Sequence, residues 1–251
     1  MSEHVKVELD AGHLAITLAR PERRNAITVA MYLALADAVE SAAVDAGIRV
    51  ISLRGEGEDF TGGNDLADFM QAIPRDGEDI PVWRLLRALA RNTTPIVAAV
   101  QGNAVGIGTT MLLHCDLVVA ADDARFSMPF VDLGLVPEAA SSLLLPRLAG
   151  RRRAARYLLL AEPFGAEEAR EFGLASHIVP KAELEAVLGD TVARLLAKPA
   201  EALRLTQQLL RLGSADETAE RMELENGHFS ERLTSSEVRE AITAFFDRKR
   251  G

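Results

Sequence analysis

Several features are scarce or missing in this sequence, and each absence excludes a class of protein. There is one cysteine, Cys115, in 251 residues, so an internal disulfide cannot form. No apolar run approaches the length of a membrane-spanning helix. The opening segment MSEHVKVELD has neither a basic nor an apolar region, so we expect no secretory signal. Together these absences predict a cytoplasmic protein with no membrane partner.

Positive charge is also in short supply. The chain has 28 Lys and Arg against 37 Asp and Glu, which gives a formal net charge of -9. Such a molecule repels nucleic acids, so we expect no nucleic-acid partner, and any anionic ligand needs a local basic patch. No two of the histidines have a helical ligand spacing, which predicts no metal site. They are His4, His13, His114, His177 and His228.

What the sequence does contain is a regular alternation of short strands and helices in its first half. This alternation predicts an α/β domain built from stacked strand–helix units. Asp10 to Gly12 has the composition of a hairpin turn, and Thr28 is placed to cap a helix. The expected strands are 5–9, 13–18, 49–53, 96–100 and 117–120, and the expected helices include one from Thr28 and one over 82–91.

From about residue 151 the composition changes to Ala, Leu, Glu and Arg, which favours helices. The C-terminal third is therefore expected to form a helical layer. Such a layer either packs on the domain or mediates oligomer formation.

The glycine-rich turn Gly102 to Gly108 has two interpretations. Its two glycines before a helix partly match a dinucleotide-binding fingerprint, but Met111 replaces the third glycine. The favoured interpretation is an oxyanion hole, in which free backbone N–H groups stabilise charge that develops during a reaction. A second donor is then needed, and in FTGGNDL two glycines would let the N–H of Asn64 turn inward.

Four separated segments carry a family resemblance: RPERRNAIT, DFTGGNDLADF, PIVAAVQGNAVGIGTTMLLHCDLVVA and FSMPFVDLGLVPEAASS. In this order and spacing the chain resembles the crotonase (enoyl-CoA hydratase/isomerase) superfamily, from about Val5 to Val179. The resemblance implies a ββα superhelix over 1–180 and a helical region over 181–251 that packs on the core or on a neighbouring subunit. It also implies a homotrimer or a dimer of trimers. The substrate would be an acyl-CoA thioester, with no separate cofactor because coenzyme A is part of the substrate.

The same resemblance assigns site residues. The oxyanion hole falls on the backbone N–H groups of Asn64 and Ile107. Typical enoyl-CoA hydratases have two glutamates where this chain has Thr110 and Phe130. The segments GNDL, NAVGI and PEAASS instead resemble peroxisomal-type Δ3,Δ2-enoyl-CoA isomerases, whose catalytic glutamate falls on Glu138.

Other substrate-binding residues follow from the same resemblance. They are Arg24, the backbone of Ala26, Gly63, Asp65, Leu66 and Gly106. For the arginines Arg20, Arg23 and Arg24 the alternative is a solvated turn. Thr109 and Thr110 are interpreted as ordinary helix-start residues, and the alternative is that their hydroxyls lie near the thioester. Loop 69–81 is expected to set the acyl range. The resemblance also implies that Phe245, Phe246 and Lys249 reach the coenzyme A pocket, sometimes of a neighbouring subunit, with core packing as the alternative for the two aromatic residues.

Glu138 has a plausible alternative role. Pro followed by Glu is an ordinary helix start, so Glu138 could simply favour a helix beginning at Pro137. Apolar neighbours would raise the pKa of its carboxyl, and the helix start would lower it.

Two rival functions also stay open. One is a hydratase or another enolate reaction that uses Asp65, Asp68 or Asp132, and the other is an acyl-CoA-binding protein without turnover.

Overall fold

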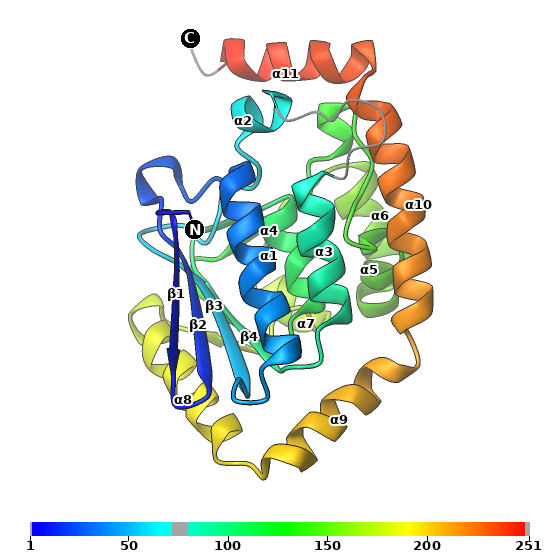
Figure 1. The fold of residues 1–251 in the computed structure, drawn as a ribbon. Coiled ribbons are helices and arrows are strands. Elements are labelled where there is room, and N and C mark those ends of the chain that lie inside the picture. The colour runs from blue at the N-terminus through cyan, green and yellow to red at the C-terminus, as the bar shows by residue number, and fades with distance from the viewer. Residues whose placement is uncertain (1, 72–79, 249–251) are drawn as a thin grey trace.

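The expected N-terminal hairpin begins the larger of two β-sheets (Figure 1). The structure is a computed structural model that describes residues 2–71 and 80–248. The larger sheet has the order β1-β2-β3-β4-β6-β9; β1 and β2 are antiparallel, and all other neighbours are parallel. Its strands are β1 (Val5–Asp10), β2 (His13–Leu18), β3 (Val50–Gly55), β4 (Ile96–Val100), β6 (Leu117–Ala121) and β9 (His177–Val179).

A smaller sheet of three strands includes a segment that was predicted to be a turn only. Its strands are β5 (Asn103–Val105), β7 (Arg125–Ser127) and β8 (Phe164–Gly165), with β5 parallel to β7. The residues 103–105 become a strand because they pair with 125–127. That partner is distant in sequence, so the local composition gave no sign of it.

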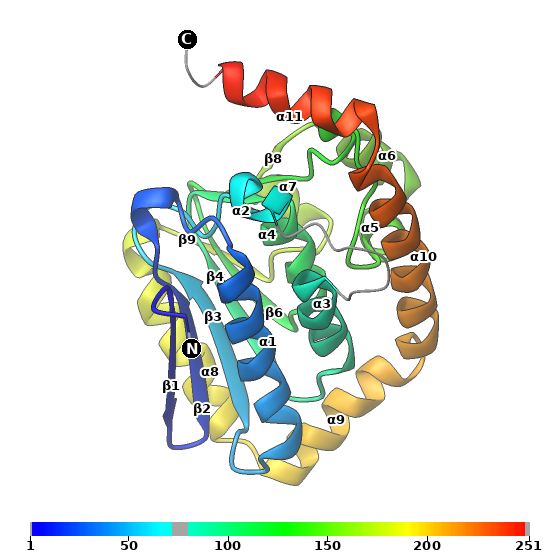
Figure 2. The same cartoon turned by 45° about the horizontal axis from the view of Figure 1, so that its top comes forward.

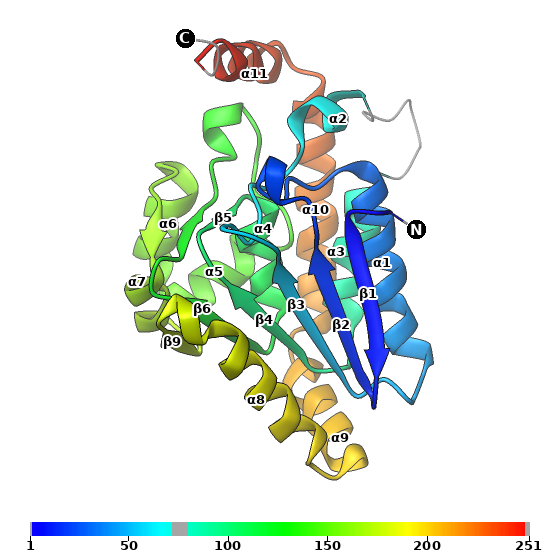
Figure 3. The ribbon, with the colours of Figure 1, turned by 90° about the vertical axis from the view of Figure 1, so that its left-hand side faces the viewer.

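Helices cover both faces of the larger sheet (Figure 3). The helices α1 (Val29–Val44) and α3 (Pro81–Arg91) pack against one another on one face. The helix α8 (Leu184–Leu196) packs on β3, β4 and β6 on the other face. Every residue of β4 is buried, as expected for a parallel strand covered on both sides. The expected cap of α1 is confirmed, because the Thr28 hydroxyl accepts the N–H of Met31.

The predicted helical C-terminal region is also confirmed. The helix α9 (Ala200–Leu212) lies below the sheet, α10 (Ala215–Leu233) runs up one side of the molecule, and α11 (Ser236–Arg248) crosses the top (Figures 1 and 2). On α10, Phe229 packs edge-on against Trp83 of α3, with ring centroids 5.3 Å apart. The remaining helices are α2 (Leu66–Gln71), α4 (Ile107–Thr110), α5 (Ser141–Ala149), α6 (Arg151–Leu159) and α7 (Ala166–Glu171). Short 3-10 helices are η1 (Pro21–Arg23), η2 (Met111–His114), η3 (Val131–Leu133) and η4 (Lys181–Glu183).

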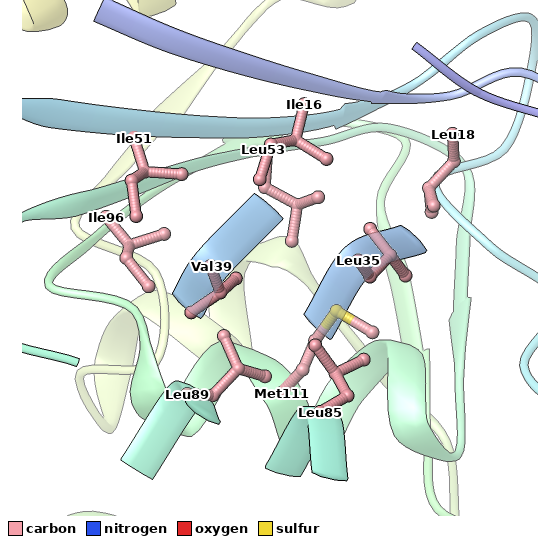
Figure 4. A pocket seen from close by; sticks show the side chains of 10 residues that line it. All are labelled: Ile16, Leu18, Leu35, Val39, Ile51, Leu53, Leu85, Leu89, Ile96 and Met111. Carbon is pink, nitrogen blue, oxygen red and sulfur yellow. The ribbon is translucent and has the colours of Figure 1, made fainter. Parts of the chain in front are cut away.

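A small cavity of about 20 Å³ lies in the core between the sheet and the helices α1 and α3 (Figure 4). All the side chains that line it are apolar, and they include Leu35 of α1, Leu85 of α3 and Met111 of η2. A cavity without polar groups stays dry and has no chemistry to offer. This cavity therefore belongs to the packing of the core and is not a candidate site.

Candidate active site

Two glycine-containing loops lie directly against one another and form one rigid unit. The N–H of Thr61 donates to the carbonyl of Asn103 at 2.9 Å, and the N–H of Val105 donates to the carbonyl of Thr61 at 3.1 Å. These two bonds are a parallel bridge between the loop after β3 and the strand β5. The loop that carries Asn64 is thereby fixed relative to the loop that carries Ile107.

Glycine is required where the two loops approach. Gly63 has a φ of +83°, and a Cβ on it would lie 2.6 Å from the carbonyl oxygen of Val105. A Cβ on Gly108 would lie 2.4 Å from the Cγ2 atom of Thr61. Gly106 needs no extra space, but its φ of 57° and ψ of -117° are open essentially to glycine alone. The glycines noted in the sequence therefore allow this close contact and this turn.

The contact leaves two backbone donors unused. Within residues 2–71 and 80–248, no hydrogen bond uses the N–H of Asn64 or the N–H of Ile107. The neighbours of both are engaged: Asp65 N–H donates to the carbonyl of Ile27, and Gly106 N–H donates to the carbonyl of Ser127. Two preorganised free amides are what an oxyanion hole requires.

Tyr32 of α1 contacts the side chain of Asn64, the residue that carries one of these donors. Its hydroxyl donates a hydrogen bond to Oδ1 of Asn64. The Tyr32 side chain is buried, and burial, with a smaller effect from the charge of Glu138, raises the pKa of its hydroxyl well above the usual value. Tyr32 is therefore a neutral donor at working pH, and it lies close enough to Glu138 to feel its charge.

Glu138 is a buried acid, with 3% of its surface exposed. Its Oε1 accepts a hydrogen bond from the Thr110 hydroxyl, whereas its Oε2 has no partner among the described residues. Burial raises the pKa of this carboxyl from 4.5 to about 8; the Thr110 bond lowers it and the charge of Glu225 raises it further. An acid with this pKa can exchange a proton near neutral pH.

The predicted helix start at Pro137 is wrong. The helix α5 begins at Ser141, and Glu138 lies in a turn before it. Ala139 and Ala140 have φ values of 61° and 54°, a left-handed conformation that alanine adopts at a cost and that clusters at functional sites. The interpretation of Glu138 as a first-turn residue of that helix is therefore wrong as well.

The side chain of His114 stabilises the turn at Ala139 and Ala140. Its Nε2 lies 2.8 Å from the carbonyl oxygen of Ala139 and donates to it. Burial lowers the pKa of His114 to about 4, so the ring is neutral at physiological pH. The side chain of Arg211 in turn donates to the carbonyl of His114 at 2.7 Å. His114 thus supports the segment that carries Glu138.

The residues expected to bind coenzyme A lie at the edge of the glycine loops. The Arg24 side chain is exposed and its Nε lies 3.8 Å from Oδ2 of Asp59, while its carbonyl accepts the N–H of Gly62 at 2.7 Å. The Arg20 guanidinium donates to the carbonyl of Ala26 at 3.0 Å and to Asp65 at 2.8 Å. Of the predicted basic patch, Arg20 is therefore occupied within the protein and Arg24 is presented outward.

The rival acids are engaged elsewhere. Burial opposes ionisation of Asp65, but the bond from Arg20 and backbone N–H bonds outweigh it and lower its pKa. Asp68 accepts the N–H of Val29 at 2.6 Å, at the start of α1. Asp132 is exposed. Glu138 alone among these acids is buried with a free oxygen.

Three residues with contacts to the site were not singled out as site residues from the sequence. Tyr32 and Glu225 were not named, and Thr110 was interpreted as an ordinary helix-start residue. The one signal was a polar side chain on an otherwise apolar helix face.

Most of loop 69–81, the side chains of Phe245 and Phe246, and Lys249 lie outside the described residues, so the roles expected for them stay predictions. In the described part, no group of three or more potential ligands is placed to hold a metal, and no helix is long and apolar enough to cross a bilayer.

Known proteins resemble this chain over almost its whole length. The enoyl-CoA hydratase/isomerase family matches residues 8–251. A 1,2-epoxyphenylacetyl-CoA isomerase from Escherichia coli is 32% identical over 99% of this chain and 97% of its own. An enoyl-CoA delta isomerase 2 from Rattus norvegicus is 32% identical over 99% of this chain and 64% of its own.

A solved structure extends the likeness to the whole fold. It is an enoyl-CoA hydratase/isomerase from Pseudoalteromonas atlantica, with a TM-score of 0.92 and 38% identity, covering 98% of each chain. The expected crotonase-like α/β fold with a helical C-terminal region is confirmed by this likeness. The chain belongs to the enoyl-CoA hydratase/isomerase family, whose members act on acyl-CoA thioesters.

Proposed function

We propose that this protein is a Δ3,Δ2-enoyl-CoA isomerase that moves a double bond through a thioester enolate. The observation that carries the proposal is one buried carboxylate, Glu138, with a free oxygen and a pKa of about 8. The positions at which typical hydratases have glutamates are occupied by Thr110 and Phe130. Hydration needs groups that position and activate a water, whereas isomerisation needs one base.

The reaction balances with the residues at hand. Ionised Glu138 takes the proton at C2 of a 3-enoyl-CoA, and the electron pair of that C–H bond moves into the thioester carbonyl to form a dienolate. The N–H groups of Asn64 and Ile107 stabilise the oxygen's negative charge. Glu138, now protonated, returns the proton to C4, the double bond forms between C2 and C3, and the base is regenerated.

The pKa of about 8 suits both halves of this cycle. At pH 7 about one tenth of the free enzyme has ionised Glu138, which is enough to start the reaction, and the protonated form is a competent acid for the return step. Because the base must be ionised, kcat/KM is expected to rise with pH and to level off above about pH 8.

The test supplies a 3-enoyl-CoA and a 2-enoyl-CoA in separate reactions and follows double-bond position and water addition in the products. We expect migration with the 3-enoyl thioester and loss of migration in Glu138→Gln, with the Kd for the thioester nearly unchanged. Glu220→Gln is a matched control, because Glu220 is an exposed glutamate on α10. Hydration of the 2-enoyl thioester without migration would instead establish a hydratase. Tight binding without either product would establish a binding protein.

The assembly and the coenzyme A contacts are part of the proposal. A homotrimer or a dimer of trimers and binding through Arg24, Ala26 and Leu66 rest on the family resemblance. The outward position of Arg24 supports a phosphate contact, because an acidic protein holds phosphates through such local cations.

A further inference from the structure

A second buried acid lies on the inward face of α10. The residues of that face follow helical spacing, and all are buried: Met222, Glu225, Asn226, Phe229 and Leu233. Glu225 has 5% of its surface exposed. A carboxylate in such a place is costly unless its oxygens are bound, so its position needs a specific reason.

The reason is at the start of α5. The N–H of Ser142 donates to Glu225 Oε1 at 2.9 Å, and the backbone of Ala140 also contributes a hydrogen bond to the carboxylate. Ala140 stands at the N-cap of α5 and offers no side-chain acceptor. A helix start leaves N–H groups unsatisfied, and Glu225 satisfies them from another helix.

The segment that Glu225 contacts is the one that presents Glu138. Ala139 and Ala140 are both left-handed, a conformation that persists only where the surroundings hold it. The Ser141 N–H donates to the Glu138 carbonyl at 3.0 Å, and His114 holds the Ala139 carbonyl at 2.8 Å. Glu225 adds the contact from the C-terminal helix.

The two acids also share an environment. Glu225 Oε2 and Glu138 Oε2 are both buried without a partner among the described residues. The charge of Glu225 raises the pKa of Glu138, and burial raises the pKa of Glu225 itself. Like charges in a site of low polarity cannot both ionise cheaply.

We propose that Glu225 is a positioning residue for the proton transfer: through the backbone N–H of Ser142 it holds the left-handed turn that carries Glu138. The inference rests on the proposed role of Glu138 as the base. It assigns to α10 a function in the reaction that the family resemblance does not place there.

Arginines on α10 itself and on the helices that pack against it, α3 and α5, have partners of their own. On its own helix, Arg221 lies one turn earlier and donates to the Ser142 hydroxyl at 3.1 Å. On α5, Arg147 is paired with Glu217 at 2.6 Å. On α3, Arg87 lies 3.8 Å from Glu223. The charge of Arg221 lowers the pKa of Glu225, whereas Arg147 and Arg87 pair with other acids of α10.

The test uses two substitutions and one control. Glu225→Gln removes the charge and keeps an oxygen that accepts the Ser142 N–H, whereas Glu225→Leu removes both. The control is Glu220→Gln, which removes one exposed charge from the same helix. For Glu225→Leu we expect kcat to fall about 10²-fold, as for a misplaced catalytic group, while KM changes less than about threefold. The kcat of Glu225→Gln is expected to fall less, and the kcat of the control is expected to be unchanged.

A second readout needs no substrate. The protonated Glu138 carboxyl is followed by infrared spectroscopy across pH, and its band is assigned by its loss in Glu138→Gln. In Glu225→Gln the titration midpoint is expected to move to lower pH, and in Glu220→Gln to stay. Should Glu225→Leu fail to fold, this titration decides. An unchanged midpoint in Glu225→Gln together with wild-type kcat would overturn the inference. A shifted midpoint in an enzyme that never isomerises would support it and refute the proposed function instead.

Discussion

Replacing Glu138 with glutamine is expected to stabilise the folded protein, and the gain is expected to grow with pH. Burial raises the pKa of this carboxyl from 4.5 in the unfolded chain to about 8 in the folded one. Glutamine has the same size and stays neutral at every pH. The substitution therefore removes the cost of burying a charge while abolishing the base, a stability–activity trade-off.

The sign follows from where each state holds its proton. Below about pH 4.5 the carboxyl is protonated in both states and costs nothing. Between the two pKa values the unfolded chain has lost the proton and the folded one has kept it, so raising the pH favours unfolding. At about 1.4 kcal/mol per unit, the full cost is about 5 kcal/mol, with about 3 kcal/mol present at pH 7 and about 1 kcal/mol at pH 5.

The assay is urea unfolding at about pH 5, pH 7 and pH 9, at one fixed protein concentration, because association would change the apparent stability. The free energy of unfolding of Glu138→Gln should exceed that of wild type by a margin that widens by several kcal/mol over this range. The exposed Glu220→Gln should show no widening. A margin that stays constant with pH would mean that Glu138 titrates at an ordinary pKa, and the argument for a buried base would fail.

Two further predictions concern the surroundings of the base and of the oxyanion hole. Thr110→Val removes the hydrogen bond that lowers the pKa of Glu138, so the rise of kcat/KM with pH should move to higher pH. Thr110→Ser keeps the hydroxyl and should keep the wild-type pH profile. An unchanged profile in Thr110→Val would show that the hydroxyl does not reach the base. Gly63→Ala would force a Cβ to within 2.6 Å of a carbonyl oxygen and displace the Asn64 N–H, so kcat should fall about 10²-fold. Gly189→Ala, whose Cβ would meet nothing within 4 Å, is the control, and equal kcat in both would contradict the placement of that donor.

Most of the regular structure could be predicted because its signals are local. The hairpin, the Thr28 cap and the buried strand at 96–100 depend on residues within a few positions of one another, and the structure contains each of them. Strand β5 could not be found in this way, because residues 103–105 become a strand only through pairing with 125–127. Short segments owe their state to their neighbours in space.

The same distinction between local signals and distant contacts applies to the residues of the site. Gly63 and Gly106 mark their own backbone conformations, so the loops of the predicted oxyanion hole were found from sequence. Tyr32 reaches Asn64 across 32 positions, and Glu225 reaches Ser142 across 83. No local pattern announces such pairs. A polar residue on an apolar helix face is the only trace, and it does not say which segment it will contact.

The late start of α5 supports the proposed division of roles between two acids. Had the helix begun at Pro137, its free N–H groups would have stabilised the Glu138 carboxylate and made it a weaker base. Instead Ala139 and Ala140 turn the chain before Ser141, and Glu225 accepts the N–H of Ser142. Glu225 takes the hydrogen bond that a first-turn acid would have received. Glu138 keeps a free oxygen and a pKa near the working pH. We therefore infer that the left-handed conformation of Ala139 and Ala140, although it costs stability, is what leaves Glu138 as a buried carboxylate that can transfer a proton.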